Sequence, residues 1–266
     1  MTWHSVLMGL FSRRTGPLDW QGYLADFHRD HVGAIEELLQ RIESGGRSPY
    51  SWFARAVSES CTTVLDLACG TGAVGRELAR PDRQVIGVDL SAHELAEARR
   101  RSPDGTFLRA DARHLPLKDA SMQAVVSSFG FAVVRPMPVL AREVERVLAP
   151  GGVVAIISPS WQALQLHDIP AVSKLFSVLH STPRLPSQRT TPSLFAAHGI
   201  RKVEDARERY TYTVRNREDA ERLLEALYLP GVAAVRISAA VDALTERADR
   251  RPVHITVPMR RCVGIK

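Results

Sequence analysis

The chain has 266 residues, of which 45% are hydrophobic, and a formal net charge of +6 at pH 7. This hydrophobic share is ample for a globular core, and no apolar run approaches the ~20 residues that a membrane-spanning helix needs. Three scattered cysteines offer neither metal-site spacing nor a disulfide framework. Composition therefore excludes a membrane-spanning or disulfide-rich class and favours one globular α/β unit over residues 1–266.

The positive charge is uneven along the chain. Residues 1–150 carry 18 basic and 18 acidic side chains, whereas residues 151–266 carry 17 basic and 11 acidic ones. A basic half raises RNA as a partner. The arginines are scattered among acids, however, and aromatic residues make up only 6% of the chain. Composition thus argues against a nucleic-acid partner.

The first sixty residues predict helices and no exported leader. An apolar patch at residues 3–11 precedes Arg13 and Arg14, which is the reverse of the order in a secretory signal. We therefore expect a cytoplasmic protein. Apolar residues recur at helical spacing over 33–42, and a short helix is predicted over 51–57. We interpret residues 1–60 as an N-terminal helical cap.

Apolar runs alternate with helical patterns between residues 61 and 160. Ser91 and Glu94 form a capping box, which opens one of these helices. The alternation predicts an α/β fold with a parallel sheet and helices on both faces. The predicted strands are 64–67, 85–90, 106–108, 124–127 and 153–158.

After residue 160 the pattern is less regular. A partly helical insertion over 161–180 leads to a sixth strand over 202–214, in which Val203, Tyr210 and Tyr212 are candidates to face inward. Asn216 caps a helix, a second helix follows, and the last strand covers 253–263. We divide the chain into the cap, a cofactor-binding core over 61–160, and a substrate-side half with lid insertions over 161–266.

The first strand opens into a glycine turn, which suits a nucleotide-like cofactor. Gly70, Gly72 and Gly75 read as G-x-G-x-x-G with Asp89 at the end of the next strand, a spacing that also fits NAD. Asp66 argues against NAD, because a carboxylate in the turn repels a pyrophosphate. A cofactor with a cationic ammonium and sulfonium would instead favour that acid. A further acid, Asp111, ends the third strand.

Taken together, VLDLACGTG, VIGVDLS, LRADARHLPL and EVERVLAPGG resemble the class I methyltransferases that use S-adenosylmethionine. The resemblance covers roughly residues 50–160 in the expected order and spacing, with Ala68 in place of the first glycine of the usual turn. It implies a Rossmann-like, doubly wound, mostly parallel seven-stranded sheet. The antiparallel last strand would lie between the fifth and sixth strands. A helical lid would be contributed by residues 1–55, 160–190 and 216–250.

The resemblance also implies roles for individual residues. Asp66 and the Gly70–Gly72 loop would contact the methionine portion of S-adenosylmethionine. Asp89 would hold the ribose hydroxyls, and Asp111, with the Ala112 backbone beside it, the adenine amino group. The full set of predicted cofactor-binding residues is Tyr50, Asp66, Ala68, Gly70, Gly72, Asp89, Leu90, Asp111, Ala112 and Ser128.

The predicted activity is methyl transfer to O, N or C of a small molecule, such as a specialised metabolite. A hydroxyl acceptor would need a base, for which His28 and His167 are the candidates. His28 and His31 lack a third ligand at zinc spacing, so no metal is expected. Two alternatives stay open: methylation of rRNA or tRNA, and binding of the cofactor without methyl transfer. The oligomeric state is also open, with a homodimer as one option.

Overall fold

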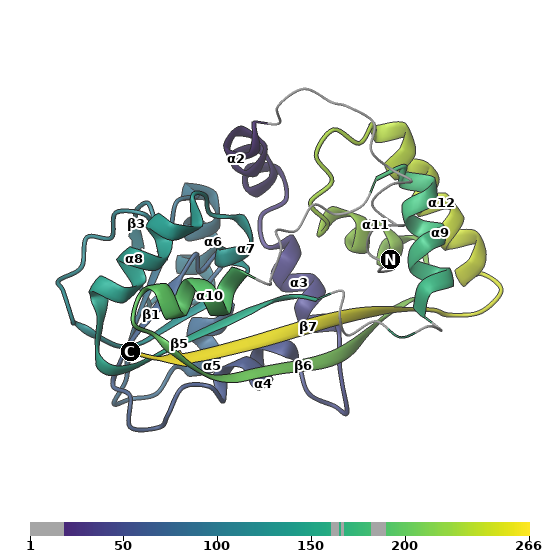
Figure 1. Cartoon of the computed structure of the whole chain (residues 1–266). Coiled ribbons are helices and arrows are strands. Elements are labelled where there is room, and N and C mark those ends of the chain that lie inside the picture. The colour runs from purple at the N-terminus through teal and green to yellow at the C-terminus, as the bar shows by residue number, and fades with distance from the viewer. Residues whose placement is uncertain (1–18, 161–164, 166–167, 182–189) are drawn as a thin grey trace.

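The protein is described by a computed structural model over residues 19–160, 165, 168–181 and 190–266 (Figure 1). The strands are β1 (Thr63–Leu67), β2 (Gln84–Asp89), β3 (Thr106–Arg109), β4 (Met122–Ser128), β5 (Leu148–Pro159), β6 (Arg201–Val214) and β7 (Val253–Ile265). The helices are α2 (Trp20–Asp30), α3 (Ala34–Arg41), α4 (Pro49–Ala54), α5 (Ala73–Leu78), α6 (Ala92–Arg101), α7 (Gly130–Val133), α8 (Met137–Val147), α9 (Ile169–Leu179), α10 (Thr190–Ala197), α11 (Arg217–Glu225) and α12 (Ala234–Ala248).

The seven strands form one sheet in the order β3-β2-β1-β4-β5-β7-β6. Neighbouring strands from β3 to β5 are parallel, whereas β7 pairs antiparallel with both β5 and β6. The predicted Rossmann-like fold, with its antiparallel last strand between the fifth and sixth strands, is confirmed. The strand order reverses between β1 and β4, and in such sheets a ligand crevice lies outside the carboxyl ends of the strands.

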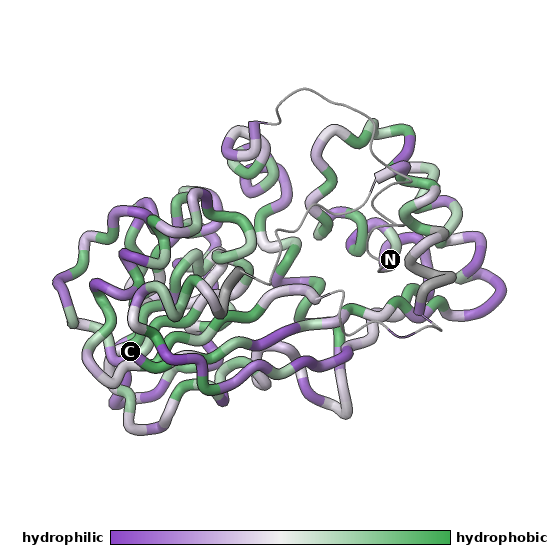
Figure 2. Tube along the Cα trace, in the orientation of Figure 1, coloured by the Kyte–Doolittle hydropathy of each residue, from purple (hydrophilic) through white to green (hydrophobic). Residues whose placement is uncertain are grey.

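Both faces of the central strands are buried. Val64 belongs to the hydrophobic cluster on one face of the sheet and Leu65 to the cluster on the other, and Ala124 and Val125 divide in the same way. Burial on both faces explains why these strands read as continuous apolar runs rather than alternating ones. Figure 2 shows the same runs as hydrophobic stretches in the interior of the sheet.

The lid is built against the long outer strands. β6 and β7 extend beyond the parallel strands, and α9, α11 and α12 gather at the end of this hairpin (Figure 1). Helices α11 and α12 connect β6 to β7, so the chain leaves the sheet to form the lid and then returns. Asn216 caps α11 by accepting a hydrogen bond from the Asp219 N–H, which explains where that helix begins.

Two sequence predictions about strands are corrected. Val203 does not face inward: its side chain is 43% exposed, because the register of β6 against β7 shifts between Lys202 and Glu204. Tyr210 and Tyr212 are buried, as predicted. The fifth strand begins at Leu148, five residues earlier than predicted, because Leu148 pairs with Met122 ahead of a second register shift.

None of the described helices is both long and apolar enough to cross a membrane.

Candidate functional site

The turn between β1 and α5 uses left-handed backbone at three positions. Ala68, Gly70 and Gly72 have φ values of 56°, 52° and 80°. For alanine this conformation costs about 1–2 kcal/mol, whereas glycine adopts it freely. Asp89 holds the turn in place, because its Oδ2 accepts the Gly70 N–H at 2.8 Å and its Oδ1 accepts the Ser91 N–H at 2.8 Å. The end of β2 thereby fixes the turn and the start of α6 together.

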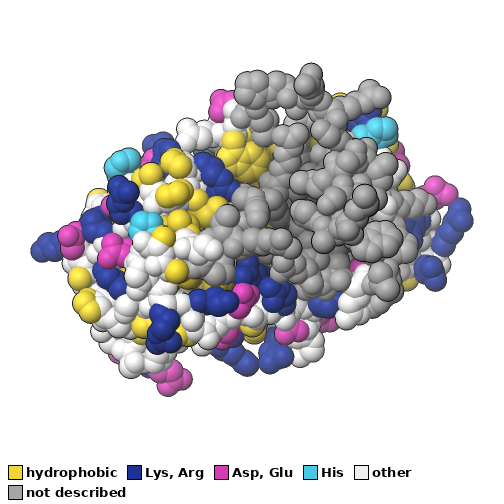
Figure 3. All heavy atoms as spheres, in the orientation of Figure 1, with side chains coloured by type: hydrophobic (Ala, Val, Ile, Leu, Met, Phe, Trp, Pro, Cys, Tyr) yellow, Lys and Arg dark blue, Asp and Glu magenta, His cyan; other side chains and the backbone are white. Residues whose placement is uncertain are grey.

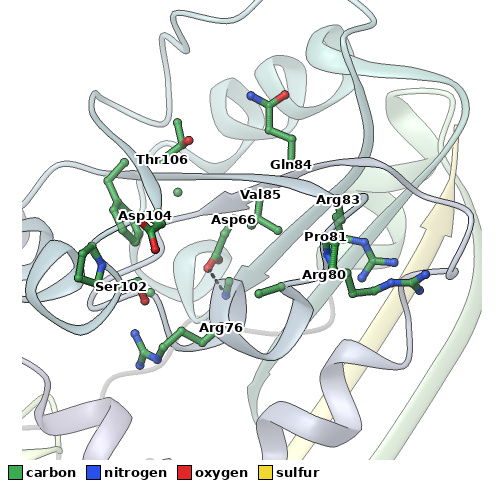
Figure 4. A pocket seen from close by; sticks show the side chains of 17 residues that line it. Asp66, Arg76, Arg80, Pro81, Arg83, Gln84, Val85, Ser102, Asp104 and Thr106 are labelled. Carbon is green, nitrogen blue, oxygen red and sulfur yellow. Dashed lines mark hydrogen bonds between the residues drawn. The ribbon is translucent and has the colours of Figure 1, made fainter.

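Asp66 lies beneath the same turn. Its side chain is almost fully buried, and Oδ2 accepts the Gly75 N–H at 3.0 Å (Figure 4). Within the described part of the chain, Oδ1 has no hydrogen-bond partner. Burial raises the pKa of Asp66 to about 7, and the nearby Asp89 carboxylate adds to the rise. The carboxyl thus supports the turn through one oxygen and leaves the other unsatisfied.

Asp66 also borders a cavity of about 580 Å³ beside α5. Figure 4 shows this cavity, whose other walls include the segments that precede β2 and β3, residues 80–84 and 102–106. Those segments lie at the amino ends of their strands. Most of this cavity is therefore separated from the carboxyl ends, where ligands of such sheets bind.

Helix α3 supports the turn from the other side. Glu36 is 4% exposed, pairs with Arg76 and Arg101, and accepts a hydrogen bond from the Thr71 hydroxyl. Arg76 in turn donates to the Thr71 carbonyl at 2.6 Å. Sequence reasoning missed Glu36, because an acid beside an apolar helical stripe resembles an ordinary solvent-facing residue.

The turn is surrounded by acids. Glu94 is a third acid near this turn, besides Asp66 and Asp89. Its side chain is 5% exposed, and its Oε2 would lie 3.7 Å from a Cβ placed on Gly70. Burial raises the pKa of Asp89, and the Glu94 charge raises it further. Such a cluster favours a cationic ligand and disfavours a pyrophosphate. The unsatisfied oxygen of Asp66 and this ring of acids fit S-adenosylmethionine better than NAD.

The glycine turn and the carboxyl ends of β1, β2 and β3 form an edge that we call the cofactor rim. The remaining predicted cofactor residues lie along this rim or close to it. Asp111 follows β3 and makes a two-oxygen contact with the Arg113 guanidinium, which lowers the pKa of its carboxyl. Leu90 is 61% exposed just past β2, whereas Ala112 is buried. Ser128 ends β4.

Tyr50 lies in α4 and is nearly fully buried. Burial raises the pKa of Tyr50 well above its usual value, and the charges of Glu36, Asp66 and Glu94 contribute to the rise. Tyr50 thus interacts electrostatically with the acids around the turn. Its ring belongs to the hydrophobic core.

His28, near the end of α2, connects this helix with two other parts of the molecule. Its Nδ1 lies 2.8 Å from Glu94 Oε1 on α6, and its Nε2 lies 3.2 Å from the Tyr228 hydroxyl between α11 and α12. A carboxylate can only accept, so Nδ1 carries the proton and the Tyr228 hydroxyl donates to Nε2. Burial raises the pKa of Tyr228 well above its usual value, with the Glu94 and Asp89 charges adding to it. Tyr228 therefore connects the lid, through His28, to Glu94 beside the glycine turn.

A second cavity, of about 120 Å³, lies under the lid. All three predicted lid segments contribute walls: α3, α9, and α11 with the residues that follow it. The strand ends contribute Phe129, Ser160 and residues 255–258. Gly130, the residue after Phe129, lies against the glycine turn: a Cβ on Gly130 would come 3.0 Å from the Ala68 Cβ. The described apolar side chains that line it are Ile35, Leu38, Leu39, Phe129, Pro159, Leu175, Phe176, Leu223, Ala226, Leu227, Tyr228, Ile255, Val257 and Pro258.

His167, the other predicted base, lies outside the described residues. Its neighbour Asp168 is buried and accepts hydrogen bonds from Arg209 and the Thr256 hydroxyl. These contacts tie the start of α9 to β6 and β7. Across the described residues, no group of three or more His, Cys, Asp or Glu side chains could hold a metal ion.

Comparisons with known proteins agree with this arrangement. Residues 64–152 match the family model described as a methyltransferase domain. The chain is 45% identical to a demethylmenaquinone methyltransferase of Beutenbergia cavernae over 37% of this chain and 42% of that protein. It is 29% identical to a ubiquinone/menaquinone biosynthesis C-methyltransferase of Caulobacter vibrioides over 65% of this chain and 82% of that protein. The chain spans about half the length of the first curated relatives it matches.

Solved structures show the same fold. The crystal structure of the [4+2]-cyclase SpnF has a TM-score of 0.61 at 19% identity, with 96% of this chain and 99% of that chain covered. At this identity the likeness concerns the fold alone. Residues 64–152 are thus similar to a methyltransferase domain, and the seven-stranded sheet has the fold that the resemblance to class I S-adenosylmethionine-dependent methyltransferases predicts.

Proposed function

We propose that the protein binds S-adenosylmethionine at the carboxyl ends of β1, β2 and β3 and transfers its methyl group to an apolar aromatic small molecule. The observation that carries this proposal is the position of the cavity under the lid. Its walls are almost entirely apolar, and its wall residue Phe129 precedes Gly130, which lies against Ala68 in the glycine turn with the buried acids.

The cofactor contacts follow from the rim. Asp89 would hold the ribose hydroxyls, while Leu90, Asp111 and Ala112 would surround the adenine. The methionine portion would lie at the Ala68–Gly72 turn, with Tyr50 and Ser128 nearby. Asp66 would act through its charge from beneath the turn. When bound, S-adenosylmethionine supplies an electrophilic methyl group, so the protein mainly has to align an acceptor. Alignment of this kind is worth about 7–11 kcal/mol.

The acceptor is inferred from the cavity and from the relatives. Apolar walls select an apolar body, and a dry cavity near this volume holds an aromatic ring (~150 Å³ holds benzene). Two relatives are named for quinone-pathway methylation. We therefore infer a quinone-like or phenolic acceptor, with oxygen or ring carbon as the acceptor atom.

Methylation of a hydroxyl, or of a ring carbon beside one, releases a proton. Tyr228 lines the cavity, and its hydroxyl donates a hydrogen bond to His28 Nε2. The Tyr228 hydroxyl would take the acceptor's proton while passing its own to His28. The Glu94 carboxylate would then stabilise the imidazolium, and the part-exposed His28 would release the proton to solvent.

The alternatives receive less support. In the basic half, Arg217, Arg222 and Arg261 are paired with acids. On the described surface in Figure 3, basic side chains are interspersed with acidic ones. These features disfavour an RNA acceptor. Binding without methyl transfer remains the alternative from another class, since a protein with the same fold is named a cyclase.

The test is a transfer assay with the purified full chain and S-adenosylmethionine. The acceptor panel is 1-naphthol, 2-methyl-1,4-naphthohydroquinone and a bulk tRNA sample, with products identified by mass spectrometry. We expect S-adenosylhomocysteine and a methylated aromatic product in equal amounts. Methylated tRNA would favour the first alternative. Cofactor binding without any methylated product would favour the second. The cytoplasmic location stays a prediction.

A further inference from the structure

Among the described residues that line the cavity under the lid, one side-chain hydroxyl has no hydrogen-bond partner. Among the described lining residues, Ser160, Tyr228 and Thr256 carry side-chain hydroxyls. The Tyr228 hydroxyl is bonded to His28, and the Thr256 hydroxyl donates to Asp168 at 2.6 Å. Within the described part of the chain, Ser160 Oγ has no hydrogen-bond partner.

Ser160 is held rigidly at a strand end. It directly follows β5, and its N–H donates to the Pro258 carbonyl on β7 at 2.8 Å. The residue is 1% exposed, so in this arrangement bulk water does not satisfy its hydroxyl. A buried hydroxyl without a hydrogen-bond partner destabilises the folded protein. A ligand group that bonds to Ser160 would remove this destabilisation.

We propose that Ser160 is the polar anchor of the acceptor site, and that its hydroxyl bonds to a single carbonyl or hydroxyl group on an otherwise apolar ring. The inference rests on the proposed function, because it takes this cavity as the acceptor site. The apolar walls select the ring, and Ser160 selects its polar group and sets its orientation. Ser160 and Phe129 follow β5 and β4, which are adjacent parallel strands, so both residues lie at the carboxyl-end edge of the sheet.

The test compares two ligands that differ only in the polar group. Acetophenone and ethylbenzene are titrated into the full-length protein, and binding is followed by NMR of the Ile35 and Leu227 methyl groups in the cavity wall. We expect Ser160→Ala to weaken acetophenone binding about five- to tenfold, as for one hydrogen bond. Ethylbenzene affinity should stay unchanged. Ser158→Ala is the matched control, because Ser158 lies two residues earlier on β5 and is not among the lining residues.

Each result decides the matter. If Ser160→Ala leaves acetophenone binding unchanged, or weakens both ligands equally, the anchor role is wrong. If neither ligand binds the wild-type protein, the cavity is not such a site and the inference also fails. Binding is measured without S-adenosylmethionine, so failure of methyl transfer with intact, Ser160-dependent binding would overturn the proposed activity and leave the anchor standing.

Discussion

The cofactor rim and the cavity under the lid are assembled from the chain in different ways. The rim comes from a single segment, residues 66–112, in which β1, β2 and β3 each carry an acid at or just past the end of the strand. The cavity draws its walls from α3, α9, α11 and β7, together with the ends of β4 and β5. A cofactor site that depends on a backbone turn must be encoded locally. An acceptor site that depends on side-chain packing can be built from distant segments.

The largest expected effect is a loss of cofactor affinity when the glycine turn of the rim is changed. Gly70→Val places a branched side chain at φ 52°, in the backbone turn proposed to approach the cofactor. We expect S-adenosylmethionine affinity, measured by calorimetry, to fall at least about tenfold, because the valine side chain would block the close approach of the cofactor to the turn backbone. Gly151→Val is the control, because Gly151 also has positive φ and has nothing within 4 Å of an added Cβ. It should lower stability without lowering affinity; equal affinities in both variants would contradict the turn's role.

The next prediction distinguishes proton transfer at the lid from cofactor binding at the rim. His28→Gln removes the proton acceptor, so kcat for a phenolic acceptor should fall about 100-fold while cofactor affinity stays within a few-fold. His31→Gln is the control on the same helix end, and an equal loss of kcat there would argue against proton transfer.

A smaller effect concerns the ribose. Asp89→Ala removes a carboxylate that is proposed to bind the ribose hydroxyls and that accepts hydrogen bonds from Gly70 and Ser91. We expect a loss of cofactor affinity of about 10- to 100-fold, as for hydrogen bonds to a charged group. Asp119→Ala, which removes an exposed acid, is the control. Unchanged calorimetric affinity in Asp89→Ala would show that the ribose lies elsewhere.

The smallest effect concerns pH. Because the pKa of Asp66 is about 7, its negative charge is lost below that pH, and affinity for a cationic cofactor should fall by up to about tenfold per pH unit. The raised folded-state pKa also means that the apoprotein loses stability as the pH rises from about 4 to about 7. Asp66→Asn should therefore bind the cofactor more weakly, yet unfold at a higher urea concentration than the wild-type protein at about pH 8. A less stable variant would contradict the direction of this pKa shift.

Sequence alone predicted the rim far better than the cavity. The glycine turn and the strand-end acids are visible as local patterns, whereas the doubly wound sheet and the antiparallel β7 followed from the resemblance. Ser160, Glu94 and Glu36 were not predicted as site residues, because their roles depend on helices packing across the sheet rather than on spacing. Val203 was misplaced because it lies in the register shift between Lys202 and Glu204, which depends on the pairing of β6 with β7 rather than on the local sequence.

The most direct test of the central claim is a crystal structure with S-adenosylhomocysteine bound. We predict the ribose at Asp89, the adenine beside Leu90 and Asp111, and the sulfur facing Phe129 and the cavity under the lid. A ligand in the cavity beside α5, or a sulfur that faces away from the lid, would contradict the account.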